Sequence, residues 1–116
     1  GLGSGKLLAV TSGQRIPYKS SVGGRTWRWT GQGMGEDGQY QGGLALALAP
    51  GRIFLAAAGA QGVAPGLFYS PDGESWRDIP LGLEAGSGIS ALYALADDRL
   101  LVAAGERGLW KVEAIP

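Results

Sequence analysis

The sequence predicts an all-β protein built from short antiparallel strands, on three observations. The 22 glycines among 116 residues, dispersed between runs of Ala, Leu and Val, indicate short strands joined by tight turns rather than long helices. One pattern, a basic residue that opens an apolar run, recurs after 46 and 47 residues (from 6 to 52 and from 52 to 99), at Lys6–Val10, Arg52–Ala56 and Arg99–Ala103. A hydrophobic content of 45% is enough for the core of one domain.

The recurring run is one strand of a repeat unit of four, whose strands we call A to D. A Gly-containing loop and a further strand follow each run, at residues 16–19, 67–69 and 109–112. An apolar strand precedes the second and third runs, at residues 44–49 and 89–96, with turns at Pro50-Gly51 and Asp97-Asp98. The chain therefore reads B-C-D, then A-B-C-D, then A-B-C.

The alternative for residues 44–58 is a helix rich in Ala and Leu. Pro50-Gly51 in the middle of this stretch favours two strands and a turn. The A and B strands are apolar on consecutive residues, which is typical of a sheet covered on both faces.

Between strands C and D of the second unit lies the polar turn Tyr69-Ser70-Pro71-Asp72-Gly73-Glu74-Ser75-Trp76. Residues 67–69 form the strand that enters the turn, and residues 76–79 form its antiparallel return. The hydroxyl of Ser70 and the carboxylate of Asp72 can accept hydrogen bonds from N–H groups of the turn, and Gly73 supplies the positive φ that closes it. We therefore expect this turn to be held by its own side chains.

A second copy of this arrangement is Ser20-Ser21-Val22-Gly23-Gly24-Arg25-Thr26-Trp27, which has Val22 where an Asp is expected. The shared spacing Ser-x-Asp-x-Gly-x-Thr-Trp resembles the Asp box of the BNR-repeat β-propellers, the group that includes sialidases, sortilin-like receptors and photosystem II assembly factors. The later copy is one residue shorter and has Glu74 near the position of the second Gly. Each box is followed by Trp, and the two Trp residues are 49 positions apart (from 27 to 76), which fits the length of one propeller blade. The residues assigned to the two boxes are Ser20, Gly24, Thr26, Trp27, Ser70, Asp72, Gly73 and Trp76.

The resemblance implies about two and a half to three four-stranded antiparallel propeller blades in one segment, with blade 1 at 6–33, blade 2 at 42–82 and blade 3 at 88–116. So few blades cannot close a ring alone. Either the chain is part of a longer propeller, or identical copies assemble into a ring, for which a dimer is favoured. The same resemblance favours a secreted or extracytoplasmic location.

Propellers of this group bind ligands mostly at the loops near the central axis, and here the ligand would be a protein or a carbohydrate. The residues that such loops would offer are Arg15, Glu36, Asp37, Tyr40, Glu84, Glu106 and Arg107. Solvation of exposed loops is the alternative interpretation of these polar residues. By contrast, we expect Trp27, Trp76 and Trp110 to pack between blades or beside a turn, and Trp29 either to pack or to contact a partner.

The composition argues against several kinds of chemistry. There is no His for a Ser-His-Asp triad and no Cys for thiolate chemistry, so we predict no catalytic residue, no metal site and no cofactor. Ten basic and ten acidic residues, without a run of either sign, argue against nucleic acid as a partner. No apolar run approaches the roughly 20 residues of a membrane span.

The sequence therefore predicts a non-catalytic binding or scaffolding segment that assembles into a complete propeller. Two alternatives remain open. One is a hydrolase of the glycosidase or sialidase type, which would use arginines and a Tyr–Glu pair. The other is an excised propeller fragment with no independent function.

Overall fold

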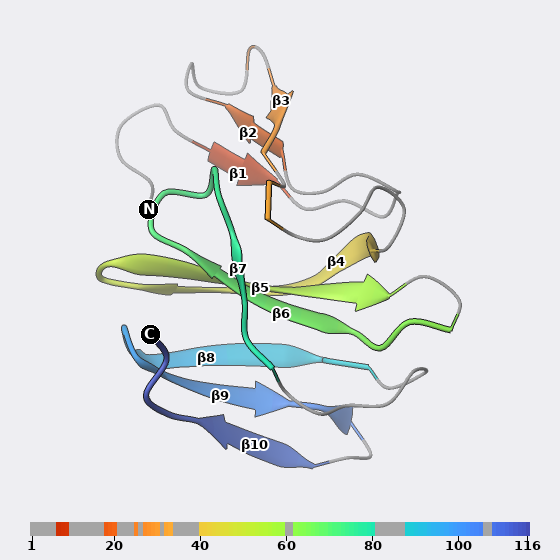
Figure 1. Cartoon of the computed structure of the whole chain (residues 1–116), viewed down its shortest axis with the longest axis vertical. Helices are drawn as coiled ribbons and strands as arrows, with labels where there is room; N and C mark the ends of the chain where they lie inside the picture. The colour runs from red at the N-terminus through yellow and green to blue at the C-terminus, as the bar shows by residue number, and fades with distance from the viewer. Residues whose placement is uncertain are drawn as a thin grey trace.

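The computed structural model describes residues 7–9, 18–20, 25, 27–30, 32–33, 40–59, 62–80, 88–105 and 108–116. These residues form ten strands in three antiparallel sheets (Figure 1). The first sheet contains β1 (Leu7–Ala9), β2 (Tyr18–Ser20) and β3 (Arg28–Trp29). The central sheet contains β4 (Tyr40–Ala49), β5 (Arg52–Gly59), β6 (Gly66–Ser70) and β7 (Arg77–Asp78). The third contains β8 (Ala91–Ala96), β9 (Arg99–Ala103) and β10 (Leu109–Val112).

The prediction of an all-β fold is confirmed, and no described residue lies in an α-helix. Within each sheet, every strand pairs with the next strand of the chain. In chain order, the sheets contain three, four and three strands. The helix considered for residues 44–58 is wrong, because β4 and β5 form a hairpin that turns at Pro50 and Gly51. Some strand bounds also differ from expectation: β8 begins two residues later than predicted, and β4 begins four residues earlier. Residues 16 and 17, predicted to begin the strand that contains Tyr18–Ser20, lie outside the described residues.

The three sheets are stacked in chain order, with the central sheet between the other two (Figure 1). Residues 53–57 of β5 and all of β6 are buried, so the middle strands of the central sheet have no side exposed to solvent. Their consecutive apolar residues are explained by this double burial, since each face of the sheet needs its own apolar side chains.

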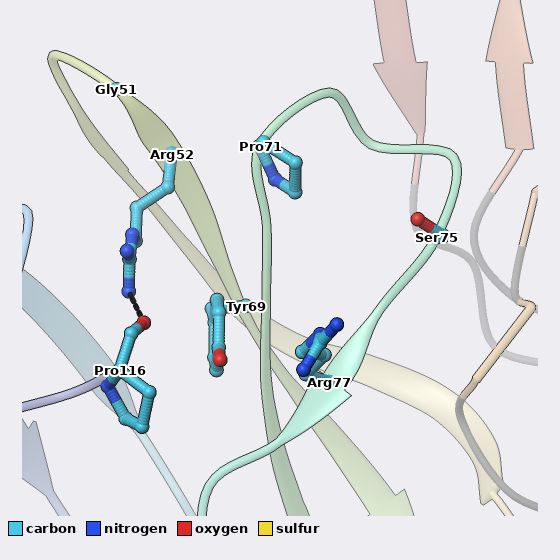
Figure 2. Close-up of a pocket in the computed structure, with 7 residues that line it drawn as sticks. All are labelled: Gly51, Arg52, Tyr69, Pro71, Ser75, Arg77 and Pro116. Carbon is cyan, nitrogen blue, oxygen red and sulfur yellow. Dashed lines mark hydrogen bonds between the residues drawn. The ribbon is translucent and has the colours of Figure 1, made fainter.

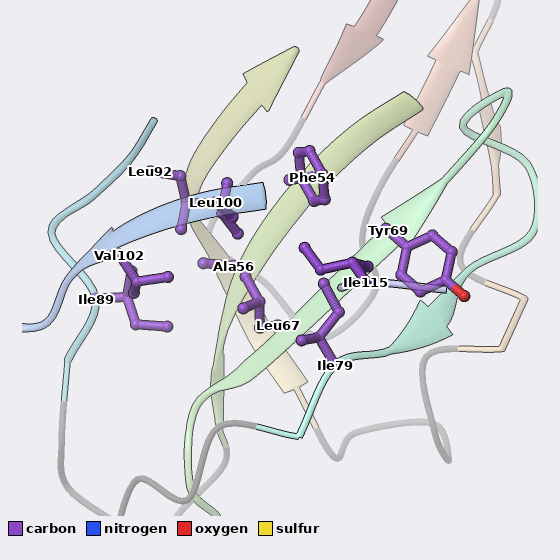
Figure 3. Close-up of a cluster of buried hydrophobic side chains, with 10 residues drawn as sticks. All are labelled: Phe54, Ala56, Leu67, Tyr69, Ile79, Ile89, Leu92, Leu100, Val102 and Ile115. Atoms are coloured by element: carbon purple, nitrogen blue, oxygen red, sulfur yellow. The ribbon is translucent and has the colours of Figure 1, made fainter. Parts of the chain in front are cut away.

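The main core lies between the central sheet and the third sheet (Figure 3). The central sheet contributes Phe54 and Ala56 from β5 and Leu67 and Tyr69 from β6. The third sheet and the segments beside it contribute the buried residues Ile89, Leu92, Leu100, Val102 and Ile115, and Ile79 follows β7. Alternate residues of each strand thus meet across the two sheets, as expected for sheets packed face to face.

A second cluster covers the opposite face of the central sheet. It contains Ile53, Leu55, Ala57, Phe68 and Trp76, with the half-buried ring of Tyr40 packed against it. The rings of Tyr40 and Phe68 meet edge to face, with centroids 5.1 Å apart and an interplanar angle of 84°. This is the face on which the residues after β3 contact Trp76.

Candidate functional site

The turn between β6 and β7 is held by a compact set of hydrogen bonds from its own side chains. The buried hydroxyl oxygen of Ser70 accepts from the backbone N–H groups of Asp72 (3.2 Å) and Gly73 (2.8 Å). The same hydroxyl donates to Oδ1 of Asp72 (3.1 Å), and that oxygen also accepts from the N–H of Glu74 (2.9 Å). Gly73 has a φ of 80°, the left-handed conformation that favours glycine. These contacts agree with the expectation from the sequence, and they give Asp72 a role in the turn.

Trp76, directly after the turn, connects the central sheet to the residues that follow β3. Its indole Nε1–H donates to the carbonyl oxygen of Thr30 (2.8 Å), and its backbone N–H donates to the carbonyl oxygen of Gln32 (2.8 Å). Only 3% of Trp76 is exposed. Both hydrogen bonds are therefore shielded by the large buried ring.

Gly33 allows this close approach. Its φ is 91°, and a Cβ at this position would overlap the carbonyl oxygen of Trp76. Any side chain here would therefore both strain the backbone and push Trp76 away from the Thr30 segment.

Other contacts between sheets repeat the same separation along the chain. Arg28 of β3 forms a hydrogen-bonded ion pair with Glu74, and the N–H of Gly51 donates to Oδ1 of Asp97 (2.9 Å). Each of these contacts, like the bond from Trp76 to Thr30, joins residues 46 positions apart. The bond from Gly51 to Asp97 joins the turn between β4 and β5 to the turn between β8 and β9, and the contacts of Thr30 and Arg28 join the end of the first sheet to the turn between β6 and β7.

The residues predicted for the first box are only partly described. Ser20 is buried at the end of β2, and Trp27 is 43% exposed. Gly24 and Thr26 lie outside the described residues. Trp29 is half-buried, and Trp110 of β10 is 36% exposed. The prediction that Trp27, Trp76 and Trp110 are packed is therefore confirmed for the buried Trp76 and wrong for Trp27 and Trp110, whose rings are partly open to solvent.

Of the predicted ligand residues, the described part of the chain contains Tyr40 alone; Arg15, Glu36, Asp37, Glu84, Glu106 and Arg107 lie outside it. Tyr40 was expected on a loop, but it is the first residue of β4 and packs on Phe68. Burial, together with the carboxylate of Asp78, raises the pKa of the Tyr40 phenol. The structure therefore gives Tyr40 a packing role.

A cleft of about 400 Å³ opens beside the turn (Figure 2). It is lined by Gly51, Arg52, Tyr69, Pro71, Ser75, Arg77 and Pro116. Sequence reasoning missed this site, since it assigned Arg52 only the role of opening a strand. The feature that could have indicated the cleft is the register of the hairpin of β6 and β7, which pairs Tyr69 with Arg77.

Over the described ranges, no group of three or more His, Cys, Asp or Glu side chains is placed to hold a metal ion. The same residues include no helix long and apolar enough to cross a membrane. Comparison of the chain with protein-family models, with curated proteins and with solved structures finds no match.

Replacing Asp72 by Ala should lower the free energy of unfolding by about 1–2 kcal/mol, because the Glu74 N–H and the Ser70 hydroxyl lose their acceptor. Asp72→Asn keeps one acceptor oxygen and should lose less. Urea unfolding of the three proteins measures the difference. An alanine variant as stable as the parent would show that the side chain of Asp72 does not stabilise the turn.

Replacing Gly33 by Ala should destabilise the fold more than replacing Gly62 by Ala. Both glycines have positive φ, 91° and 81°, but a Cβ on Gly62 meets no atom within 4 Å. The Gly62 variant thus reports backbone strain alone, about 1–2 kcal/mol, while the Gly33 variant adds the overlap with Trp76. Urea unfolding followed by Trp fluorescence measures both. Equal losses would contradict a close packing of Gly33 on Trp76.

Proposed function

We propose that this chain is a non-catalytic scaffolding or binding segment of an Asp-box β-propeller, which becomes complete by joining further sheets of the same kind. The observation that supports the proposal is the stacking of three antiparallel sheets in chain order, in which hydrogen bonds from Trp76 to Thr30 and from Gly51 to Asp97 join neighbouring sheets. Three sheets, which contain three, four and three strands among the described residues, are stacked in chain order, and this arrangement fits such a segment.

The outward face of the third sheet repeats the positions by which the central sheet packs. Arg52 is the first residue of β5, and Arg99 is the first residue of β9. Phe54 and Leu101 each follow that arginine by two residues, so they occupy equivalent positions in the two sheets. Across the hairpin, Ala56 pairs with Leu67 in the central sheet, and Ala103 pairs with Leu109 in the third. In the central sheet these positions are buried against the third sheet.

In the third sheet the corresponding positions are open. Leu109 is 70% exposed and Tyr93, the partner of Leu101 on β8, is 57% exposed, while Leu101 and Ala103 are half-buried. We call this surface of Tyr93, Leu101, Ala103 and Leu109 the outward face. An apolar face of several hundred Å2 carries on the order of 10 kcal/mol of burial energy, at roughly 25 cal/mol per Å2. Its occupant in the proposal is a second copy of this chain, because the face continues the packing that already joins the central and third sheets.

A closed dimer of six sheets is the expected assembly, with the outward face of each copy on the first sheet of the other. One chain has a mass of 11.9 kDa, and light scattering at micromolar concentration should report twice this mass. The double variant Tyr93→Lys, Leu109→Lys should be monomeric, since two charges would be buried at the contact. Leu48→Lys is the matched control: Leu48 is 54% exposed on β4, outside the outward face, and this variant should remain dimeric.

Two results would contradict the assembly. One is a folded parent chain that stays monomeric at this concentration. The other is loss of association in the Leu48 variant as well, which would indicate non-specific contact between apolar surfaces.

A further inference from the structure

We propose that the peptide bond between Asp72 and Gly73 is a site of spontaneous isoaspartate formation, which the hydroxyl of Ser70 suppresses while the turn is closed. Asp-Gly pairs are especially prone to this reaction, because glycine has no Cβ to hinder attack by its own backbone nitrogen. The sequence contains two such pairs, Asp37-Gly38 and Asp72-Gly73, and the first lies outside the described residues. The turn is formed within one chain, so this reaction does not depend on assembly.

The reaction needs water as its only co-reactant. The backbone nitrogen of Gly73 forms a bond to Cγ of Asp72, while the amide proton and the carboxyl O–H leave together as water. The product is a cyclic succinimide. Water then opens the ring: attack at Cγ restores aspartate, whereas attack at the main-chain carbonyl carbon gives isoaspartate, in which the chain runs through Cβ and Cγ. The water lost in the first step is regained in the second, so the mass of the chain is unchanged.

The closed turn shields the nitrogen that would attack. The N–H of Gly73 donates to the hydroxyl oxygen of Ser70 (2.8 Å), and this hydrogen bond is buried. A backbone nitrogen becomes nucleophilic only when it loses its proton to a base, which is also the step that hydrogen exchange needs. Gly73 is buried, although Asp72 is exposed. Solvent therefore reaches the side chain of Asp72, whereas the proton of Gly73 is covered.

The carboxylate that would be attacked is held by the same turn. Oδ1 of Asp72 accepts from the N–H of Glu74 (2.9 Å) and from the hydroxyl of Ser70 (3.1 Å). Ser70 thus contacts both reacting groups, since its oxygen accepts from Gly73 and its proton is donated to Asp72. Ser70 is 0% exposed, so solvent does not replace these contacts while the turn is closed. Loss of this one hydroxyl should release the nitrogen and the carboxylate together.

Isoaspartate at position 72 would weaken the contact between the first and central sheets. It lengthens the main chain by one carbon and attaches the free carboxylate directly to Cα, so the hydrogen bonds that Oδ1 of Asp72 now accepts would be lost. Trp76 follows four positions later (from 72 to 76), and its two N–H groups donate to Thr30 and Gln32. A distorted turn displaces the origin of both bonds. The isomerised chain should therefore unfold at a lower urea concentration than the parent.

The first test incubates the whole chain at neutral pH with and without concentrated urea. Proteolytic digestion followed by electron-transfer fragmentation distinguishes isoaspartate from aspartate, and in urea Asp37 serves as the internal reference for an Asp-Gly pair in an unfolded chain. Conversion of Asp72 should be at least about tenfold slower in buffer than in urea, since the turn must open before the nitrogen can react. Equal rates at Asp72 in the two solvents would overturn the proposal.

The second test removes the hydroxyl. In buffer, Ser70→Ala should convert Asp72 at least about tenfold faster than the parent, because a buried hydrogen bond to the nitrogen is lost. Ser90→Ala is the matched control: the hydroxyl of Ser90 donates to the carbonyl oxygen of Ala103 (3.1 Å), outside the turn, and this variant should convert Asp72 as the parent does. A variant of Ser90 that reacts as fast as the variant of Ser70 would contradict a specific role for Ser70.

A loss of global stability in Ser70→Ala is separated from opening of the turn by a matched parent sample. Urea is added to the parent until its free energy of unfolding equals that of the variant, and the variant should still convert Asp72 faster; equal rates would overturn the role of Ser70. If Ser70→Ala does not fold, hydrogen exchange of the Gly73 N–H in the parent replaces it. The fold should then slow isomerisation at least as much as it slows this exchange. Weaker protection against isomerisation would show that the nitrogen reacts without leaving Ser70.

Discussion

The bond from the indole of Trp76 to the carbonyl oxygen of Thr30 is the contact on which the joining of the first two sheets depends. One residue donates twice to the segment after β3, from its side chain and from its backbone, while its ring packs on the second cluster of the central sheet. The turn of Ser70, Asp72 and Gly73 sets the position from which Trp76 reaches that segment. The Asp-box-like sequence thus acts beyond its own hairpin, because a local turn positions a contact between sheets.

Stacking of this kind needs sheets with two apolar faces. The central sheet has them: Phe54 faces the third sheet, and the neighbouring residues Ile53 and Leu55 face the second cluster. The third sheet has the same alternation, with Leu100 and Val102 in the core and Leu101 half-buried on the outward face. A surface that repeats an internal packing face is expected where repeats continue by addition of like units. This repetition is the physical basis of the proposed assembly.

Local features of the sequence predicted most of the fold. The consecutive apolar runs and the turns at Pro50-Gly51 and Asp97-Asp98 depend on neighbouring residues, so they could be inferred without coordinates. The cleft was not predicted, because no local pattern shows that Arg52, Tyr69 and Arg77 lie together; that needs the registers of two pairs of strands, β5 with β6 and β6 with β7. Tyr40 shows the same limit: its polar surroundings in sequence suggested a ligand loop, whereas its ring is placed by Phe68, 28 positions away (from 40 to 68).

Hydrogen exchange of the indole N–H of Trp76 tests most directly whether this residue holds the first two sheets together. If the bond to Thr30 opens only when the whole fold opens, this proton should exchange with the free energy of global unfolding, the same value as the backbone N–H groups of β5. Denaturant at low concentration should lower both values in parallel. Exchange of the indole proton that is much faster than that of β5, and insensitive to denaturant, would show that the two sheets separate locally and would contradict the account.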